Sequence, residues 1–441
     1  MGFLGVAGKR AALILPLFGL AAALLAGCGG SGGISSGGIT RDPCAPNTAH
    51  TPGNAYWTIL VYMNAANNLQ PYSIQNMNQM ESVGSVPGKL NIVVQWKMAN
   101  CYDCGNPQWT GVRRYYVTHD LDGYNADVNL CSTNTNTIHS TLLRSTPTNT
   151  DMGSWQTLHD FIVWGMQNYP ADHYALIIWD HGSGWRNINR SVPQPMAGSR
   201  AVSFDDQTGD EIETWELPEA MAVTPKLDAV MFDASLEQMI EVAYEIRNSA
   251  SVMIGSEESP PGTGYPYDTI LSDLLNQINA NNGTDTPCQL GSDTVKDMIS
   301  EYGNNSNVTQ STLKLSAMDQ VASALNQFSI SLLSHINDQA AVIMNARNNA
   351  QAYEYPDNKD LYDYANQIAT TTSASDLRAA AIAMEQAVTA SVLSEAHGSQ
   401  SPGSRGLAVY VPSAQNYLST YTNLALTRVT RWAQFLQDQT Q

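Results

Sequence analysis

A histidine and a serine each follow an apolar run by two or three residues, and together they could carry out nucleophilic catalysis. His181 follows the run at residues 174–179, and Ser235 follows the run at 227–232. Apolar runs of this length suit buried strands, and ligands of open parallel sheets bind beyond the carboxyl ends of the strands. If the two strands are neighbours, His181 could act as a general base toward the Ser235 hydroxyl.

Glycines beside the histidine suit a turn that binds an oxyanion. Gly182 and Gly184 flank Ser183 and let the backbone turn tightly. We expect the N–H groups of Gly182 and Ser235 to donate to a developing oxyanion. Histidine followed by glycine, or Asp-Ala-Ser, is a weak pattern when it stands alone. The prediction therefore depends on the two motifs occurring together.

The surrounding patterns follow the order strand, helix, strand, which is typical of a parallel α/β sheet. Strands are predicted at residues 57–63, 91–96, 174–179, 227–232, 251–255 and 407–411. Helices are predicted at 154–169, 236–246, 267–280, 292–302, 317–350 and 358–397. Residues 98–150 resemble an insertion with a hairpin around 112–117. The fold-class prediction is an α/β sandwich with a mostly parallel sheet and a helix-rich C-terminal half.

Composition narrows the classes of partner. Of the 441 residues, 43% are hydrophobic, which is enough for a sizeable core. The net charge of -19 argues against nucleic acid, which requires basic surface. It is compatible with cationic peptides or divalent cations.

The first 28 residues are typical of a bacterial lipoprotein signal peptide. Lys9 and Arg10 precede an apolar stretch at 11–26, and Cys28 follows in a lipobox-like context. The implied chemistry is lipidation of Cys28, with residues 29–55 as a flexible tether. The predicted location is the cell envelope, at the outer membrane or cell surface. The alternative is a buried apolar helix followed by an incidental cysteine.

Five further cysteines leave disulfide connectivity open. Cys101, Cys104 and Cys131 lie in one region, so a local disulfide is plausible, and a zinc site is the alternative interpretation. Cys44 and Cys288 lie outside that region. Because the number is odd, at least one thiol is free or pairs with another molecule.

These motifs together resemble the clostripain-like cysteine peptidases, which share the caspase–haemoglobinase fold. The matching stretches are residues 57–63, 180–185, 232–246, 256–268 and 406–412, within a domain of 56–412 that a helical tail at 413–441 follows. The resemblance implies a caspase-like three-layer sandwich. It also implies that His181 is the catalytic histidine and that Ser235 occupies the nucleophile position. Asp233 would lie at the floor of a pocket for a basic side chain.

The chain departs from the family pattern at two positions. Ser235 stands where the family has a cysteine, whose thiol has a pKa of about 8.5 and is readily tuned lower. A serine hydroxyl is far less acidic and needs a well-oriented base. Thr263 stands where family members often carry an aspartate that helps to hold the basic residue. Glu257, after the strand at 251–255, is predicted either to shape the substrate groove or to cap a turn.

An acidic loop is the candidate metal site. Asp205 and Asp206 lie in a carboxylate cluster with Asp210 but do not complete an EF-hand pattern. Members of the resembled family can depend on calcium, so the resemblance implies a candidate Ca²⁺ site. The alternative is a solvated acidic loop.

The leading functional hypothesis is a lipid-anchored peptidase homologue with weak or no activity, because Ser235 replaces the cysteine. It would keep a cleft that binds peptides or proteins with basic residues. The second hypothesis is an active endopeptidase that cleaves after Arg or Lys with a Ser235/His181 dyad. The third is a structural or adhesive surface lipoprotein.

Overall fold

The structure is a computed structural model that describes residues 42–46, 49–98, 111–120, 138–147, 149–185, 201–281, 283, 285–303 and 306–439. Cys28 lies outside the described residues, and so do Cys101, Cys104 and Cys131. The predictions of lipidation and of a local disulfide therefore stay predictions.

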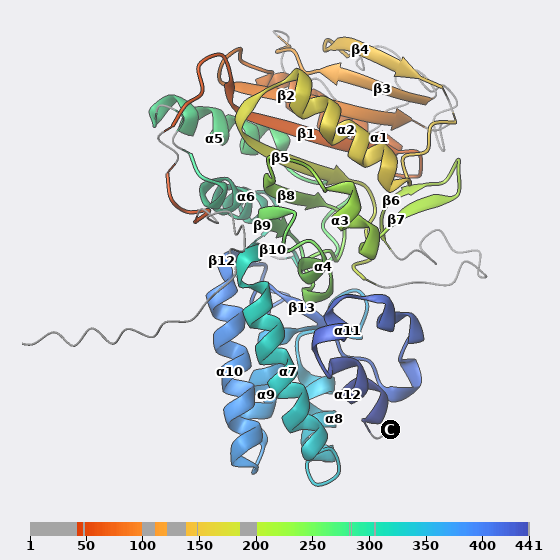
Figure 1. Cartoon of the computed structure of the whole chain (residues 1–441), viewed down its shortest axis with the longest axis vertical. Coiled ribbons are helices and arrows are strands. Elements are labelled where there is room, and N and C mark those ends of the chain that lie inside the picture. The colour runs from red at the N-terminus through yellow and green to blue at the C-terminus, as the bar shows by residue number, and fades with distance from the viewer. Residues whose placement is uncertain are drawn as a thin grey trace, which may run out of the picture. The chain divides into compact units, whose positions relative to one another are not determined.

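Among the described residues, a sheet of nine strands forms the middle layer (Figure 1). The strand order is β12-β10-β9-β8-β5-β1-β2-β3-β4. The strands from β9 to β2 are parallel and are the five that the apolar runs at 57–63, 91–96, 174–179, 227–232 and 251–255 predict. Their bounds are β1 (Ala55–Ala65), β2 (Leu90–Met98), β5 (Ala171–Trp179), β8 (Leu227–Asp233) and β9 (Ala250–Gly255).

Antiparallel strands complete both edges of the sheet. The prediction of a hairpin around 112–117 is wrong, because this segment is one strand, β3, between its partners β2 and β4. The described part of the predicted insertion thus extends the central sheet. The antiparallel strands are β3 (Gly111–Tyr116), β4 (Thr141–Thr146), β10 (Thr309–Lys314) and β12 (Val392–His397), of which β4 and β12 form the two edges.

Helices cover both faces of the sheet because successive strand residues point to opposite sides. Ile59 and Val61 share a core with α1, α5 and α6, whereas Leu60 and Tyr62 share a core with α2, α3 and α4. This arrangement confirms the predicted three-layer α/β fold. The bounds are α1 (Gln70–Val83), α2 (Trp155–Asn168), α3 (Leu217–Ala220), α4 (Ile240–Glu245), α5 (Tyr267–Ala280) and α6 (Pro287–Tyr302).

The C-terminal half is helix-rich, as predicted, with α7, α9 and α10 packed side by side (Figure 1). Two short strands pair here, β11 with β13, and another pair, β6 with β7, lies near the central strands. The helices are α7 (Met318–Ser334), α8 (Ala340–Asn349), α9 (Leu361–Thr371), α10 (Ser375–Ser391), α11 (Leu426–Val429) and α12 (Trp432–Asp438). The strands are β6 (Ala201–Asp205), β7 (Asp210–Glu213), β11 (Asn358–Asp360) and β13 (Ala408–Tyr410).

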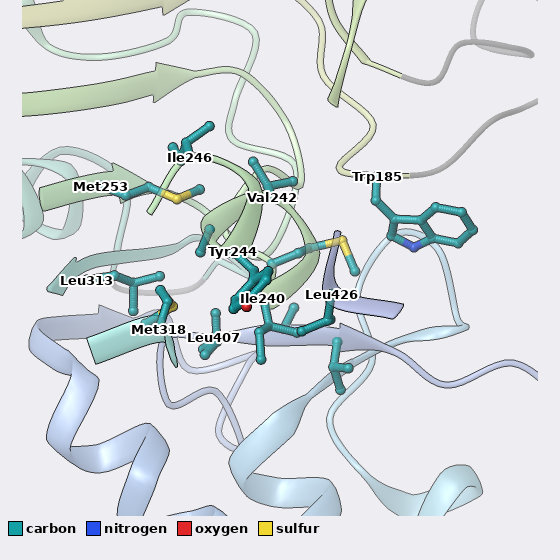
Figure 2. Close-up of a cluster of buried hydrophobic side chains, with 14 of the residues drawn as sticks. Trp185, Ile240, Val242, Tyr244, Ile246, Met253, Leu313, Met318, Leu407 and Leu426 are labelled. Atoms are coloured by element: carbon teal, nitrogen blue, oxygen red, sulfur yellow. The ribbon is translucent and has the colours of Figure 1, made fainter. Parts of the chain in front are cut away.

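A continuous hydrophobic core joins this half to the sheet. Figure 2 shows Trp185, Ile240 and Leu426 gathered with Met318 and Leu407 in one buried cluster. These side chains come from five separate segments, so α4 is packed against the C-terminal half as well as the sheet. The position of α4 matters because it directly follows the segment that carries Ser235.

Three predicted helices differ from the structure. The helix predicted at 236–246 begins at Ile240, because Leu236 has a left-handed backbone with a φ of 67°. The helix predicted at 317–350 is interrupted by a turn in which Gln339 N–H donates to His335 O at 2.9 Å. The segment 358–397 begins with β11 and ends with β12, because its ends pair with other strands.

The described part of the predicted tether is attached to the folded body. A disulfide joins Cys44 to Cys288 at the start of α6. His50 Nδ1 lies 2.5 Å from an oxygen of Asp172. The tether prediction therefore does not extend to the described residues 42–46 and 49–55, because the disulfide and hydrogen bonds to Asp172 attach them to the body. None of the described helices is long and apolar enough to cross a bilayer.

Candidate active site

His181 and Ser235 follow two adjacent strands, as the sequence predicts. β5 and β8 are paired in parallel with Trp179 opposite Asp233. Asp180 N–H donates to Asp233 O at 3.2 Å, just before the two candidate residues. The loops then touch, because a Cβ built on Gly182 would lie 2.5 Å from Ser235 O. The sheet thus places the histidine loop against the serine loop at its carboxyl edge.

Backbone hydrogen bonds to the neighbouring loop hold the serine loop before α4 begins. Leu236 N–H donates to Glu258 O at 3.4 Å, and Gln238 N–H donates to Ser256 O at 3.1 Å. Both acceptors lie just after β9, the neighbouring strand. The left-handed Leu236 is unusual for a residue with a branched side chain, and such backbone strain often occurs at functional sites.

Glu237 connects the two loops. Its Oε1 accepts hydrogen bonds from Ser183 N–H at 3.2 Å and Gly184 N–H at 3.1 Å. The side chain is buried, and burial raises the pKa of this carboxyl well above its usual range, although the two N–H donors oppose the shift. A buried carboxyl two residues after Ser235 thus joins the serine loop to the histidine loop.

The ring of His181 is held by an amide. Asn68 Oδ1 lies 2.7 Å from His181 Nε2. Burial lowers the pKa of His181 to about 4, although the nearby charge of Asp206 opposes that shift. The imidazole is therefore neutral at pH 7. Within the described residues, the ring makes no hydrogen bond to the Ser235 hydroxyl.

Asn68 and Glu237 were not among the residues predicted from the sequence. Asn68 lies just beyond the carboxyl end of β1, the strand that pairs with β5 on the side away from β8. The rule that nominated His181 and Ser235, a polar residue after a parallel strand, would also have nominated it. Glu237 carries no such signal, because its partners are backbone N–H groups that only the folded chain brings near.

Gly182 lies next to β6. It forms an isolated antiparallel bridge with Val202. This contact lays β6 beside the His181 loop. The role of the Gly182 and Ser235 N–H groups as oxyanion donors stays a prediction.

Asp233 is buried beneath Gly264, close to Thr263. Its carboxylate accepts hydrogen bonds from Tyr265 N–H at 3.1 and 3.2 Å and from the Tyr267 hydroxyl at 2.8 Å. Burial raises the pKa of Asp233 to about 6, although these donors oppose the shift. Thr263 Oγ1 lies 2.8 Å from the hydroxyl of Tyr302. The predicted pocket residues are therefore neighbours, and their contacts are with tyrosines.

The side chain of Glu257 is enclosed. Its side chain is 1% exposed, and Oε2 accepts Gly406 N–H at 3.1 Å. Burial and the neighbouring Asp360 carboxyl raise its pKa well above the usual range. The structure thus places Glu257 between β9 and the C-terminal half. The substrate-binding prediction for this residue is not supported, because its side chain is enclosed.

Asp205 is the partner of a buried lysine. Its carboxylate forms an ion pair with Lys97, and Oδ2 also accepts Met152 N–H at 2.9 Å. Asp206 is exposed, with its N–H donating to Ala66 O. Over the described ranges, no three His, Cys, Asp or Glu side chains are grouped to hold a metal ion. The cation-site prediction is not supported here, because Lys97 already neutralises Asp205.

An acidic cavity of about 250 Å³ opens near the same edge of the sheet. Its lining combines the start of α2 with β7 and the turn that follows it. The residues are Gly153, Ser154, Trp155, Gln156, Asp210, Glu211, Glu213 and Glu216. Four carboxylic side chains in one cavity favour positively charged groups.

Comparison with known proteins identifies the family. The model of the clostripain family matches residues 61–438. Clostripain from Hathewaya histolytica is 26% identical over 246 residues, which are 52% of this chain and 43% of that protein. The match therefore spans less than half the length of that relative.

Two solved structures share the fold. An inactive zymogen of a C11 protease from Parabacteroides distasonis has a TM-score of 0.59 at 20% identity, over 86% of this chain and 99% of its own. A secreted C11 cysteine protease from Bacteroides thetaiotaomicron, in complex with an irreversible peptide inhibitor, has a TM-score of 0.61 at 18% identity, over 86% and 100%. The family model covers most of the chain, and the arrangement of the sheet agrees with these structures. The chain therefore belongs to the clostripain family.

Proposed function

We propose that this chain is a peptide-binding member of the clostripain family whose own hydrolytic activity is weak or absent. The observation that carries the proposal is a serine in the loop that touches the histidine loop, together with a histidine ring whose partner is an amide. Ser235 and His181 lie in touching loops, and Asn68 is the hydrogen-bond partner of the ring.

The reason for expecting weak activity is the proton transfer that activation of Ser235 requires. To activate Ser235, His181 must take up a proton and become an imidazolium in a half-buried setting. A pKa of about 4 makes the neutral ring a weak base. Serine peptidases offset this with a carboxylate that stabilises the imidazolium, whereas cysteine enzymes can work with an amide. The described site thus suits a thiol better than a hydroxyl.

A peptide ligand with basic residues fits the charge of the chain. The net charge is -19, and the cavity near the site carries Asp210, Glu211, Glu213 and Glu216. One structural relative is a C11 protease solved with a peptide inhibitor. We therefore extend the proposal to peptides or proteins that contain Arg or Lys.

Lipid anchoring at Cys28 is part of the same proposal, since Lys9, Arg10 and the apolar stretch precede that cysteine. The full chain, expressed in a bacterium that processes lipoproteins, should sediment with membranes. Cys28→Ala should release it to the soluble fraction. Equal partition of both proteins would contradict the anchor.

Cleavage of a fluorogenic arginyl peptide tests the proposed function. We compare the parent chain with the variants Ser235→Cys and Ser235→Ala, with and without calcium. We expect Ser235→Cys to cut at least about 100-fold faster than the other two, because a thiol can be activated by a weak base. Fluorescence polarisation should detect binding of a labelled arginyl peptide to the two proteins that do not cleave it, the parent and Ser235→Ala.

The active-peptidase alternative is favoured by the contact of the two loops and by the nearby Asp233. In that mechanism Ser235 attacks the carbonyl carbon, and His181 passes the proton to the leaving amine. If the parent chain cleaves the peptide and Ser235→Ala does not, this alternative is established and our proposal is overturned.

A further inference from the structure

Two consecutive asparagines in the loop between β1 and α1 contact the His181 loop in different ways. Asn67 is buried, and its Oδ1 accepts Leu69 N–H at 2.9 Å. Its Nδ2 group is thereby oriented to donate to Asp180 Oδ1 at 2.5 Å and to Phe204 O at 3.0 Å. Asp180 Oδ1 also accepts His181 N–H at 2.6 Å. Asn67 thus fixes the backbone of the histidine.

Asn68 contacts the imidazole itself. Its Oδ1 lies 2.7 Å from Nε2 of His181. An amide oxygen only accepts hydrogen bonds, so Nε2 must carry the hydrogen in this arrangement. The other ring nitrogen, Nδ1, then has the free lone pair. Because Asn67 anchors the loop, Asn68 is presented to the ring from a fixed backbone.

We propose that Asn68 is a positioning residue that holds His181 in the tautomer with its hydrogen on Nε2, which makes Nδ1 the proton acceptor. The inference deepens the proposed function and concerns the same site. It gives the candidate site a third residue, from the loop that follows β1, in addition to His181 after β5 and Ser235 after β8.

Asn68, the third residue of the candidate site, is neutral. Asn68 orients the ring without adding negative charge. The acidic groups that face the ring or its backbone are Asp206, whose charge opposes the burial effect on the ring, and Asp180, which accepts the backbone N–H. Burial raises the pKa of Asp180 well above its usual range. A neutral orienting group suits a thiolate, which itself stabilises the imidazolium.

Nitrogen-15 NMR of the histidine rings in the full chain tests the proposal. His181→Gln identifies the His181 signals. In the parent, the shifts should report a hydrogen on Nε2 and a free Nδ1. Asn68→Ala should yield a mixture of both tautomers. Asn68→Asp should raise the pKa of His181 by about 1–3 units, because a carboxylate stabilises the imidazolium. Asn348→Asp, on α8, adds the same charge away from the site and should change neither property.

Several results would overturn the proposal. One is a parent ring with its hydrogen on Nδ1, and another is an unchanged tautomer in Asn68→Ala. A third is an Asn68→Asp protein whose His181 titrates as in Asn348→Asp. If Asn68→Ala does not fold, the titration of Asn68→Asp decides, because aspartate keeps the size and the acceptor oxygen. The NMR readout requires no cleavage, so Asn68 can hold this role even where the peptide experiment contradicts the proposed function.

Discussion

Replacing Lys97 with methionine is expected to lower the free energy of unfolding by about 3–5 kcal/mol. Lys97 and Asp205 form an ion pair with both side chains 0% exposed, and Lys97 Nζ also donates to Thr150 O at 2.8 Å. Methionine fills a similar volume but leaves the Asp205 charge buried without its cation. Urea unfolding followed by tryptophan fluorescence measures the loss.

The matched control removes both charges. Lys97→Met combined with Asp205→Asn keeps an acceptor oxygen for Met152 N–H and leaves no buried charge. Replacing a whole buried pair is often close to neutral, whereas removing one partner is strongly destabilising. The double variant should therefore recover more than half of the loss. Equal losses in the single and double variants would mean that packing, and not charge, dominates.

The same unfolding curves address the calcium hypothesis. Because Lys97 neutralises Asp205, the parent should unfold at the same urea concentration with and without calcium. A ligand that binds only the folded chain raises its stability in proportion to the logarithm of its concentration. A calcium-dependent shift of the parent would restore Asp205 and Asp206 as candidate ligands.

The central strands could be predicted because they are buried on both faces. Parallel strands with helices on both sides read as continuous apolar runs, as in β5 and β8. The antiparallel strand β10 gave no such signal, because its segment Thr309–Lys314 is mostly polar although it is buried. Ser311 satisfies its hydroxyl with Gly406 O at 2.7 Å. Burial of this kind depends on partners that lie far away in the sequence.

Prediction of the candidate site from the sequence is limited in the same way. His181 and Ser235 follow apolar runs, so their approach could be predicted from two local patterns and the topology of a parallel sheet. The disulfide between Cys44 and Cys288 spans 244 residues and could not be predicted, because no local pattern distinguishes it from other pairings. Glu237 could not be predicted for a related reason, because the donors that it contacts are backbone N–H groups of another loop.

Substituting alanine for Gly182 is expected to separate the two loops and disable the site. The added Cβ would lie 2.5 Å from Ser235 O, 2.6 Å from Glu237 Oε1 and 3.1 Å from Ala234 Cβ. Overpacking of this kind destabilises a protein by about 1–3 kcal/mol. In the Ser235→Cys background, we expect at least a tenfold loss of arginyl-peptide cleavage and of peptide binding, measured beside urea unfolding.

Two control variants distinguish a change in the spacing of the two loops from a general loss of stability. Gly88→Ala has nothing within 4 Å of its new Cβ, so it reports only the backbone strain of alanine at a φ of +72°. It should keep peptide binding and cleavage. Adding Glu237→Ala to Gly182→Ala relieves the flexible side-chain contact but leaves the Ser235 backbone in place, so function should not return. Full recovery in that double variant would assign the tight contact to Glu237 alone, and the Ser235 backbone would then not set the distance between the loops.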